Sequence, residues 1–283
     1  MFRCVPRGYK QCIIVMLHDR ATGMFVPVYY VLSTSREKRA YWNIVHFIAQ
    51  GTDQQIEPAE IVCDFEPALQ NALQVQFPNA IVIGCLFHLK QALRRAMKRF
   101  AIPDVECTIE MTRGVLNVLT VIAHDQVELG TKWVKQEIRR RCSATGVYYS
   151  KGKWRGFWGY FSRSWLEQFG VEVWNVHGLD NELVACTNNT LERYNRELTN
   201  RIPTHPSMTS FRIKTLSAES VGRLADIPRV RARRMTREVI QLTMPVEIPP
   251  DIEDDSDGDE PVALEQASDG SSDEVQATLG ITL

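Results

Sequence analysis

Four side chains in the sequence are candidates for holding metal ions: Asp64, Cys85, His88 and Glu192. Asp64 directly follows the apolar run at residues 61–63, which predicts a short buried strand with a carboxylate at its carboxyl end. Ligands and metals bind at that end of the strands in open α/β sheets. The alternative is that Asp64 only caps the following helix, whose start is marked by Pro67.

Cys85 and His88 stand one helical turn apart at the start of another predicted helix. A Cys-x-x-His pair supplies half of the ligands of a zinc site. No second pair can be identified in the sequence to complete such a site, so a buried packing pair is the alternative interpretation.

Glu192 lies in the segment 187–198, where Thr187 and the two asparagines after it can cap a helix. The apolar residues of this helix are spaced by three and four positions and define its buried face: Leu191, Tyr194, Leu198 and Ile202. Glu192 falls beside that stripe, so its carboxylate is placed to reach the end of a sheet. The alternative is an ordinary ion pair between Glu192 and Arg196, four positions later.

The elements that must position these side chains begin with a β-hairpin. Strand-like runs at residues 9–17 and 24–32 flank a turn that contains Gly23. Pro27 requires an edge position or a bulge within this hairpin. A capped amphipathic helix is predicted next, over residues 35–49.

Two further strands, at residues 61–63 and 80–84, alternate with helices that begin near residues 66 and 86. An antiparallel hairpin that leads through such crossovers into parallel strands implies a mixed α/β sheet with helices on its faces.

The helix that begins near residue 86 carries a basic face. Its basic residues are Lys90, Arg94, Arg95, Lys98 and Arg99. Such a face can bind the phosphates of nucleic acid, and the alternative is a solvated surface. A second basic run, at residues 229–237, allows the same two interpretations and a third, a nuclear localisation signal.

Residues 105–183 lack strand patterns and predict a helical insertion into the α/β domain, with two helices over residues 106–141 and an apolar stripe between Val115 and Ile122. An aromatic cluster interleaved with Lys and Arg follows this stripe: Tyr148, Tyr149, Trp154, Phe157, Trp158, Tyr160, Phe161, Trp165 and Trp174. Aromatic and basic residues together can bind nucleic acid by stacking and charge. The alternative is that the aromatic residues pack helices together.

The formal net charge of −1 hides an uneven distribution. Residues 251–283 contain eleven Asp or Glu and no Lys or Arg, which leaves residues 1–250 at about +10. A basic body with an acidic tail suggests a polyanionic partner, and the alternative is a soluble protein with a solvated disordered tail. The predicted order along the chain is a first part of the core at 1–104, the insertion at 105–183, a core helix with Glu192 at 184–204, a basic segment at 205–249 and a disordered tail at 250–283.

Cysteine usage and hydropathy point to an intracellular protein. The seven cysteines are scattered and odd in number, which fits a reducing compartment better than a disulfide framework. No signal peptide and no membrane-spanning run are recognisable. We expect a soluble protein that is not secreted and has no membrane partner.

Three motifs in this order resemble the transposase domain of Mutator-like elements: Asp64-Phe-Glu, Gly84-Cys-Leu-Phe-His88-Leu-Lys and Thr187-Asn-Asn-Thr-Leu-Glu192-Arg-Tyr-Asn. The resemblance covers roughly residues 2–202. It implies a ribonuclease H-like fold with an Asp-Asp-Glu active site, in which Asp64 matches the second aspartate and Glu192 the glutamate. It also implies two Mg²⁺ or Mn²⁺ ions for phosphoryl transfer on transposon-end DNA. Cys85 and His88 match the family's Cys-x-x-His pair, whose role stays open, with zinc as the weaker alternative.

The sequence departs from the family pattern at its first carboxylate. The family's first aspartate lies just before a segment like Phe2–Pro6, and Met1 stands there in this sequence. That aspartate normally bridges both ions, so we expect very weak or no strand cleavage and a largely truncated first strand of the sheet. Asp19 lies on the wrong side of the following strand to replace it.

Three functions follow as hypotheses. The first is a transposase-derived protein of the Mutator-like class, catalytically defective, nuclear rather than cytoplasmic, and able to form homo-oligomers on DNA. The second is a non-enzymatic DNA- or chromatin-binding protein that uses the two basic segments, with the acidic tail as a regulator. The third is a degenerate reading frame whose product hardly folds.

Overall fold

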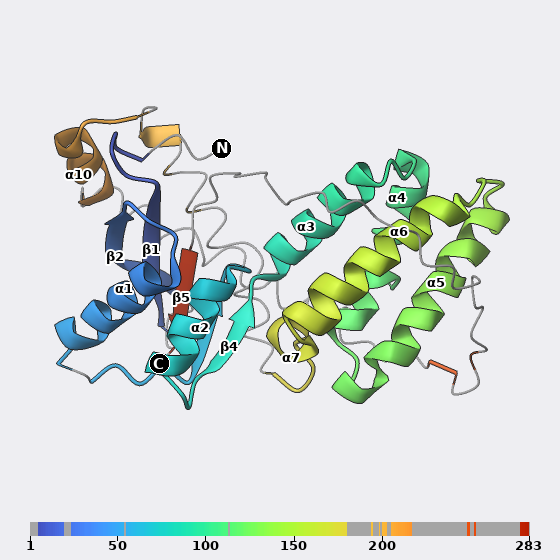
Figure 1. Cartoon of the computed structure of the whole chain (residues 1–283), viewed down its shortest axis with the longest axis horizontal. Helices are drawn as coiled ribbons and strands as arrows, with labels where there is room; N and C mark the ends of the chain where they lie inside the picture. Colours follow the sequence, from blue (N-terminus) through green and yellow to red (C-terminus); the bar gives the residue numbers. More distant parts are fainter. Residues whose placement is uncertain are drawn as a thin grey trace. The chain divides into compact units, whose positions relative to one another are not determined.

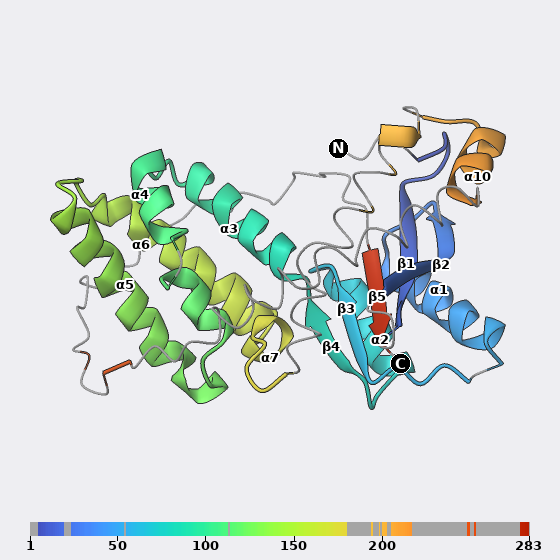
Figure 2. The ribbon, with the colours of Figure 1, turned by 180° about the vertical axis from the view of Figure 1, so that it is seen from behind.

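The computed structural model describes residues 5–19, 24–53, 55–112, 114–179, 194, 198, 200–202, 205–216, 248–249, 252 and 278–282. These residues form two compact units. The sheet unit contains the described residues up to His88, together with those between 194 and 216 and those at 278–282. The helical unit runs from Leu89 to residue 179 and includes residues 248–249 and 252. Figures 1 and 2 show both units from opposite sides.

The sheet unit begins with the hairpin that the sequence predicts. β1 (Gln11–Asp19) and β2 (Met24–Ser33) pair antiparallel, with a register shift between Val15 and Met16. Met16 pairs with Pro27, next to this shift, and β2 is an edge strand of the described sheet. Pro27 therefore occupies both of the positions that a residue without an N–H tolerates, an edge strand and the neighbourhood of a bulge.

The predicted crossover unit is also present. β3 (Glu60–Cys63) and β4 (Ile81–Gly84) are parallel strands joined by α2 (Pro67–Gln76), and α1 (Lys38–Gly51) precedes them. α2 begins at Pro67 because proline in a first helical turn lacks only an N–H that would have no partner within the helix. The mixed α/β architecture is thus confirmed.

A fifth strand, β5 (Thr278–Thr282), lies between β1 and β3 and completes one sheet of order β2-β1-β5-β3-β4 (Figure 2). It runs parallel to β1 and antiparallel to β3. The sequence analysis expects disorder over residues 250–283, and β5 corrects this expectation at these five residues. The segment differs from the acidic stretch before it because it has no charge and is rich in Thr, Leu and Ile, which suit a pleated sheet. Residues 253–277 lie outside the described part of the chain.

Helices and buried side chains cover both faces of the sheet. Alternate residues of β1 point to opposite faces, and both faces are covered, which explains why its middle part, residues 12–17, is apolar. On one face, residues of β1 and β3 are buried with those of α1 and α2: Ile13, Val15, Tyr41, Val45, Ile48, Ile61, Cys63, Leu69 and Leu73. On the other face, residues of β1 are buried with residues from the later part of the chain, including α10 (Met208–Leu216): Cys12, Ile14, Met16, Tyr194, Leu198, Ile202 and Phe211.

Gly84 ends β4 at a point where the ring of Phe65 leaves no room for a side chain. A methyl group at Gly84 would overlap the ring, so the substitution Gly84→Ala must displace Phe65. We expect it to lower the free energy of unfolding by about 1–3 kcal/mol, the usual cost of overpacking. Gly51→Ala at the end of α1 is the control, because its added carbon meets Tyr29 Oη at 3.4 Å. Equal urea midpoints for the two variants would contradict the prediction.

The helical unit contains no strand among its described residues. Its α- and π-helices in chain order are α3 (Leu86–Arg99), whose first three residues belong to the sheet unit, α4 (Asp104–Glu110), α5 (Val127–Ala144), α6 (Lys151–Phe161), the π-helix η3 (Ser162–Gln168) and α7 (Val171–Trp174). None of the helices described in either unit has the length and apolar character needed to cross a membrane.

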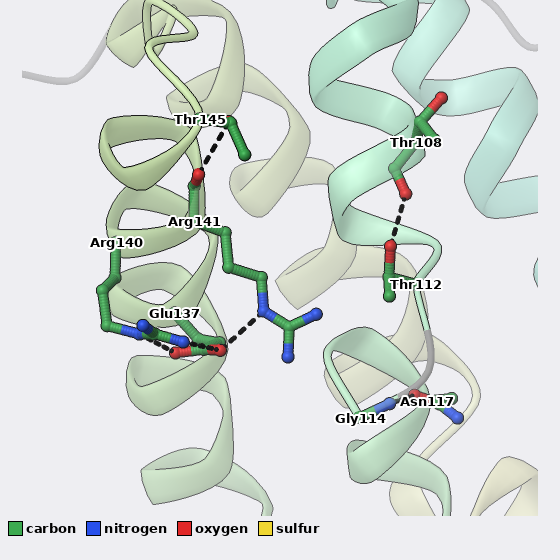
Figure 3. Close-up of polar contacts among 8 residues, drawn as sticks. All are labelled: Thr108, Thr112, Gly114, Asn117, Glu137, Arg140, Arg141 and Thr145. Atoms are coloured by element: carbon green, nitrogen blue, oxygen red, sulfur yellow. Dashed lines mark hydrogen bonds and ion pairs between the residues drawn. The ribbon is translucent and has the colours of Figure 1, made fainter.

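The apolar stripe that the sequence analysis assigns to a helix folds instead as short 3₁₀ turns, η1 (Leu116–Thr120) and η2 (His124–Gln126). Gly114 precedes η1 with a φ of +78°, a conformation that interrupts a right-handed helix. Its N–H donates a hydrogen bond of 2.9 Å to Asn117 Oδ1 (Figure 3). The prediction of two helices over residues 106–141 is therefore correct at both ends of that range, at α4 and α5, and wrong in its middle.

Packing accounts for most of the aromatic cluster. Its fully or largely buried members are Trp154, Phe157, Trp158, Phe161, Trp165 and Trp174, whereas Tyr148 is 84% exposed. A buried carboxylate, Glu106 of α4, ties this cluster to the start of α6. It accepts hydrogen bonds from Trp154 Nε1 at 2.7 Å and from the Ser150 N–H at 3.0 Å. On the exposed side of α5, Glu137 accepts hydrogen bonds from Arg140 and Arg141 (Figure 3).

Candidate active site

Four strand ends meet at one edge of the sheet. β1 starts where β2 ends because the two strands are antiparallel. β5 runs parallel to β1 and antiparallel to β3, so β3 ends at the side where β1 starts. β4 is parallel to β3 and therefore ends at the same side. The residues at these four strand ends are Gln11, Ser33, Cys63 and Gly84. Asp64 directly follows Cys63, so the predicted carboxylate stands at the carboxyl end of β3.

Asp64 is buried, with 5% of its surface exposed. Its Oδ1 lies 2.7 Å from His88 Nδ1, in the first turn of α3. Its Oδ2 accepts no hydrogen bond from any residue that the structure describes. No side-chain cap is found at the start of α2, so the alternative in which Asp64 only caps this helix is not supported. A buried carboxylate oxygen that lacks a donor retains the capacity to bind a cation.

A second carboxylate, Glu66, belongs to the same edge. It is half-buried, and burial is the largest cause of its raised pKa. The positive charge of Arg36 lowers the pKa of Glu66, and the negative charge of Asp64 raises it. The sequence analysis includes Glu66 in the Asp64-Phe-Glu motif but gives it no role of its own. The signal that could have found it is the Asp-x-Glu spacing, which places both carboxylates at one strand end.

Tyr41 of α1 is a neutral hydrogen-bond donor whose pKa is affected by burial and by the charges of Glu66 and Asp64. Its hydroxyl donates a hydrogen bond of 3.0 Å to Gln11 Oε1, and both residues are buried. Burial raises the pKa of Tyr41 to about 12, and the charges of Glu66 and Asp64 act in the same direction. Tyr41 therefore keeps its proton at neutral pH beside the two carboxylates.

Cys85 and His88 have different surroundings. Cys85 is buried, and its N–H continues the ladder between β3 and β4 by donating to the Cys63 carbonyl at 2.8 Å. His88, by contrast, approaches Asp64. Within the described parts of the chain, no three His, Cys, Asp or Glu side chains are grouped so that they could hold a metal ion.

Glu192 and Arg196 lie outside the described residues, and so does Leu191 of the predicted stripe. The other three members of that stripe, Tyr194, Leu198 and Ile202, are buried against the sheet as expected. The Tyr194 hydroxyl forms a hydrogen bond with the hydroxyl of Tyr30 on β2. The segment that follows Glu192 by two positions is thus anchored on the sheet unit that carries Asp64.

The predicted basic face lies on α3. Its exposed members are Arg94, Arg95, Lys98 and Arg99, and Lys90 is half-buried. Arg99 stacks over the ring of Tyr160 at 4.8 Å, and Arg95 donates a hydrogen bond to Gln91. These four exposed residues belong to the helical unit, whereas Asp64 and His88 belong to the sheet unit.

Comparison with known proteins gives one family. Residues 8–92 match the family model described as the MULE transposase domain, which confirms the resemblance to Mutator-like transposases. The matched stretch includes β1 to β4, Asp64, Glu66, Cys85 and His88. No curated protein and no solved structure gives a match.

Proposed function

We propose, from the premise that residues 8–92 match the MULE transposase domain, that this chain is a transposase-derived protein of the Mutator-like class that acts on DNA. The reaction of this class is DNA strand cleavage and transfer by phosphoryl transfer. A nuclear location and assembly into homo-oligomers on transposon ends belong to the same proposal.

A ribonuclease H-like interpretation of the sheet is part of this proposal. Its support is the hairpin β1–β2, the parallel pair β3 and β4, the cover on both faces and the carboxylate that follows β3. On this interpretation Asp64 and Glu192 are the second and third acidic residues of the Asp-Asp-Glu set.

The observation that carries the proposal is the buried Asp64, with one oxygen beside His88 and the other without a donor among the described residues. Carboxylate oxygens are the ligands that Mg²⁺ and Mn²⁺ prefer, and Asp64 and Glu192 would hold the ions. Such ions activate the attacking oxygen and stabilise the leaving oxygen of an in-line displacement. His88 would orient the Asp64 carboxylate through Oδ1 and leave Oδ2 to face the ligand.

We also propose that cleavage by this chain is slow. β5, the strand beside β3, has the sequence Thr-Leu-Gly-Ile-Thr and contains no acidic residue. The resemblance implies an aspartate on the strand next to the one that carries Asp64. Two carboxylates neutralise a pair of divalent ions less completely than three, so the ions would bind weakly.

The second candidate is a DNA- or chromatin-binding protein without catalysis. The exposed basic residues of α3 support it, because guanidinium and ammonium groups on one helix can neutralise successive phosphates. This function does not need Asp64 or Glu192.

Nicking of supercoiled DNA in the presence of Mn²⁺ tests the enzymatic proposal. We expect weak nicking by the intact chain, and a loss of about 10-fold or more in Asp64→Asn and in Glu192→Gln, because each removes a charged metal ligand. Glu60→Gln is the matched control, since Glu60 starts the same strand β3 at its opposite end.

Two outcomes would contradict this function. Nicking that persists in both Asp64→Asn and Glu192→Gln would assign it to a contaminating nuclease. DNA binding that falls steeply with salt, is unchanged in those variants and weakens in Arg94→Ala or Lys98→Ala would favour the second candidate.

A further inference from the structure

The gap between β1 and β3, which β5 fills, has the properties of a binding site for an extended peptide. β1 is joined to β2 by a hairpin and β3 to β4 by α2, so each pair is held by its own connection. β5, by contrast, follows α10 in the described part of the chain, and α10 ends at Leu216. No short connection to a neighbouring strand holds β5 in its place.

A helical layer connects the two sides of the gap independently of β5. α1 and α2 pack against each other, and Tyr41 and Val45 of α1 share one buried cluster with Leu69 and Leu73 of α2. The same cluster contains Ile13 and Val15 of β1 and Ile61 of β3, on the two sides of the gap. This helical layer is therefore able to keep β1 and β3 at the spacing of one strand.

The two sides of the gap also require an occupant. β5 pairs with β1 from Ile14 to His18 and with β3 from Glu60 to Val62. Ile14, Val15, Met16 and Val62 are buried with β5 in place, and removal of the strand between them would leave their backbone N–H and C=O groups on that side without protein partners. Main-chain pairing of this kind recognises any extended segment, while side-chain pockets select its sequence.

We propose that the gap between β1 and β3 is a strand-binding site whose ligand is the uncharged segment Thr278–Thr282, bound reversibly. A peptide with this sequence that is not part of the chain can therefore take the place of β5. This inference is independent of the proposed function, because it involves neither DNA nor a metal ion.

Trans-complementation tests this proposal in the full-length chain. Leu279→Pro removes a central N–H of β5 and should release the segment, because proline is not accommodated within a central strand. We expect this variant to melt several degrees below the native chain and to regain the loss on addition of a free peptide of residues 276–283. A scrambled peptide of the same composition should have no effect. Ala267→Pro, in the acidic stretch before β5, is the matched control for the introduced proline and should melt like the native chain.

The native chain gives a second, independent readout. A fluorescent peptide of residues 276–283 should bind the native chain at least about 10-fold more weakly than it binds Leu279→Pro, because the tethered segment competes at a high effective concentration. The proposal would be overturned if Leu279→Pro melts at the same temperature as the native chain, or if neither chain binds the peptide. If Leu279→Pro does not fold, the decision rests on hydrogen exchange of the native chain. The proposal would also be overturned by two results together. The backbone amides of Ile14–His18 would exchange slowly and no more slowly when saturating peptide is added, and the native chain would not bind the fluorescent peptide.

Discussion

His88→Ala is expected to lower the free energy of unfolding of the sheet unit by about 1–3 kcal/mol, the usual cost of leaving a buried polar group without its partner. The variant would leave Asp64 buried at 5% exposure with neither of its oxygens beside a described partner. Urea denaturation followed by far-UV circular dichroism at low ionic strength measures the effect. His46→Ala on α1 is the control, because the His46 ring stacks on the ring of Trp42 instead of on a carboxylate.

A divalent cation should reduce this loss. In His88→Ala, Mg²⁺ or Mn²⁺ can neutralise the negative charge of the Asp64 carboxylate, so millimolar cation is expected to restore part of the lost stability. Asp64→Asn has no such charge, so the cation should not raise its stability. A cost below about 1 kcal/mol for His88→Ala would mean that the pair contributes no more than an exposed ion pair. It would also remove the role of His88 as the group that orients Asp64.

Glu110→Leu is expected to stabilise the helical unit by several kcal/mol above pH 8 and by much less near pH 4.5. Glu110 is fully buried on α4 and accepts no hydrogen bond from the described residues. Burial raises its pKa from 4.5 to about 8, and the charge of Arg94 opposes this rise. The folded state therefore holds a proton that the unfolded state loses between pH 4.5 and 8, so native stability falls as pH rises through this window, by up to about 1.4 kcal/mol per pH unit.

Leucine removes this dependence because it has no proton to lose and suits the apolar surrounding. Urea midpoints measured at pH 4.5, 6 and 8.5 should be nearly flat for Glu110→Leu and should decline for the native chain. Asp104→Asn, an exposed acid on the same helix α4, is the matched control and should leave the decline unchanged. A native chain as stable at pH 8.5 as at pH 4.5 would show that Glu110 is ionised without cost.

The sequence was informative where local rules agree with the tertiary structure. The β1–β2 hairpin, the crossover with Asp64 at the end of β3, and the start of α2 at Pro67 follow from apolar runs, turns and the geometry of proline. These features depend on neighbours within a few residues, so a single sequence contains the information for them. The family resemblance then supplied the order of the motifs, and the first two of them lie within the match at residues 8–92.

The remaining features depend on contacts between distant parts of the chain. Thr278–Thr282 lies between β1 and β3 through pairing with residues near the start of the chain, which no local pattern predicts. The approach of His88 to Asp64 depends on where β4 and α3 lie beside β3. Gly114 interrupts the expected helix because its backbone turns, although the apolar pattern after it reads as helical.

The position of β5 affects how the protein is made. Ile14 emerges from the ribosome early, yet its partner Thr278 is synthesised only after more than 260 further residues, which takes tens of seconds at roughly 5–20 residues per second. Throughout that time the nascent sheet has two open ladders, a state in which chains associate with one another. We therefore expect molecular chaperones to engage this protein during translation, and to release it once its last strand has been synthesised.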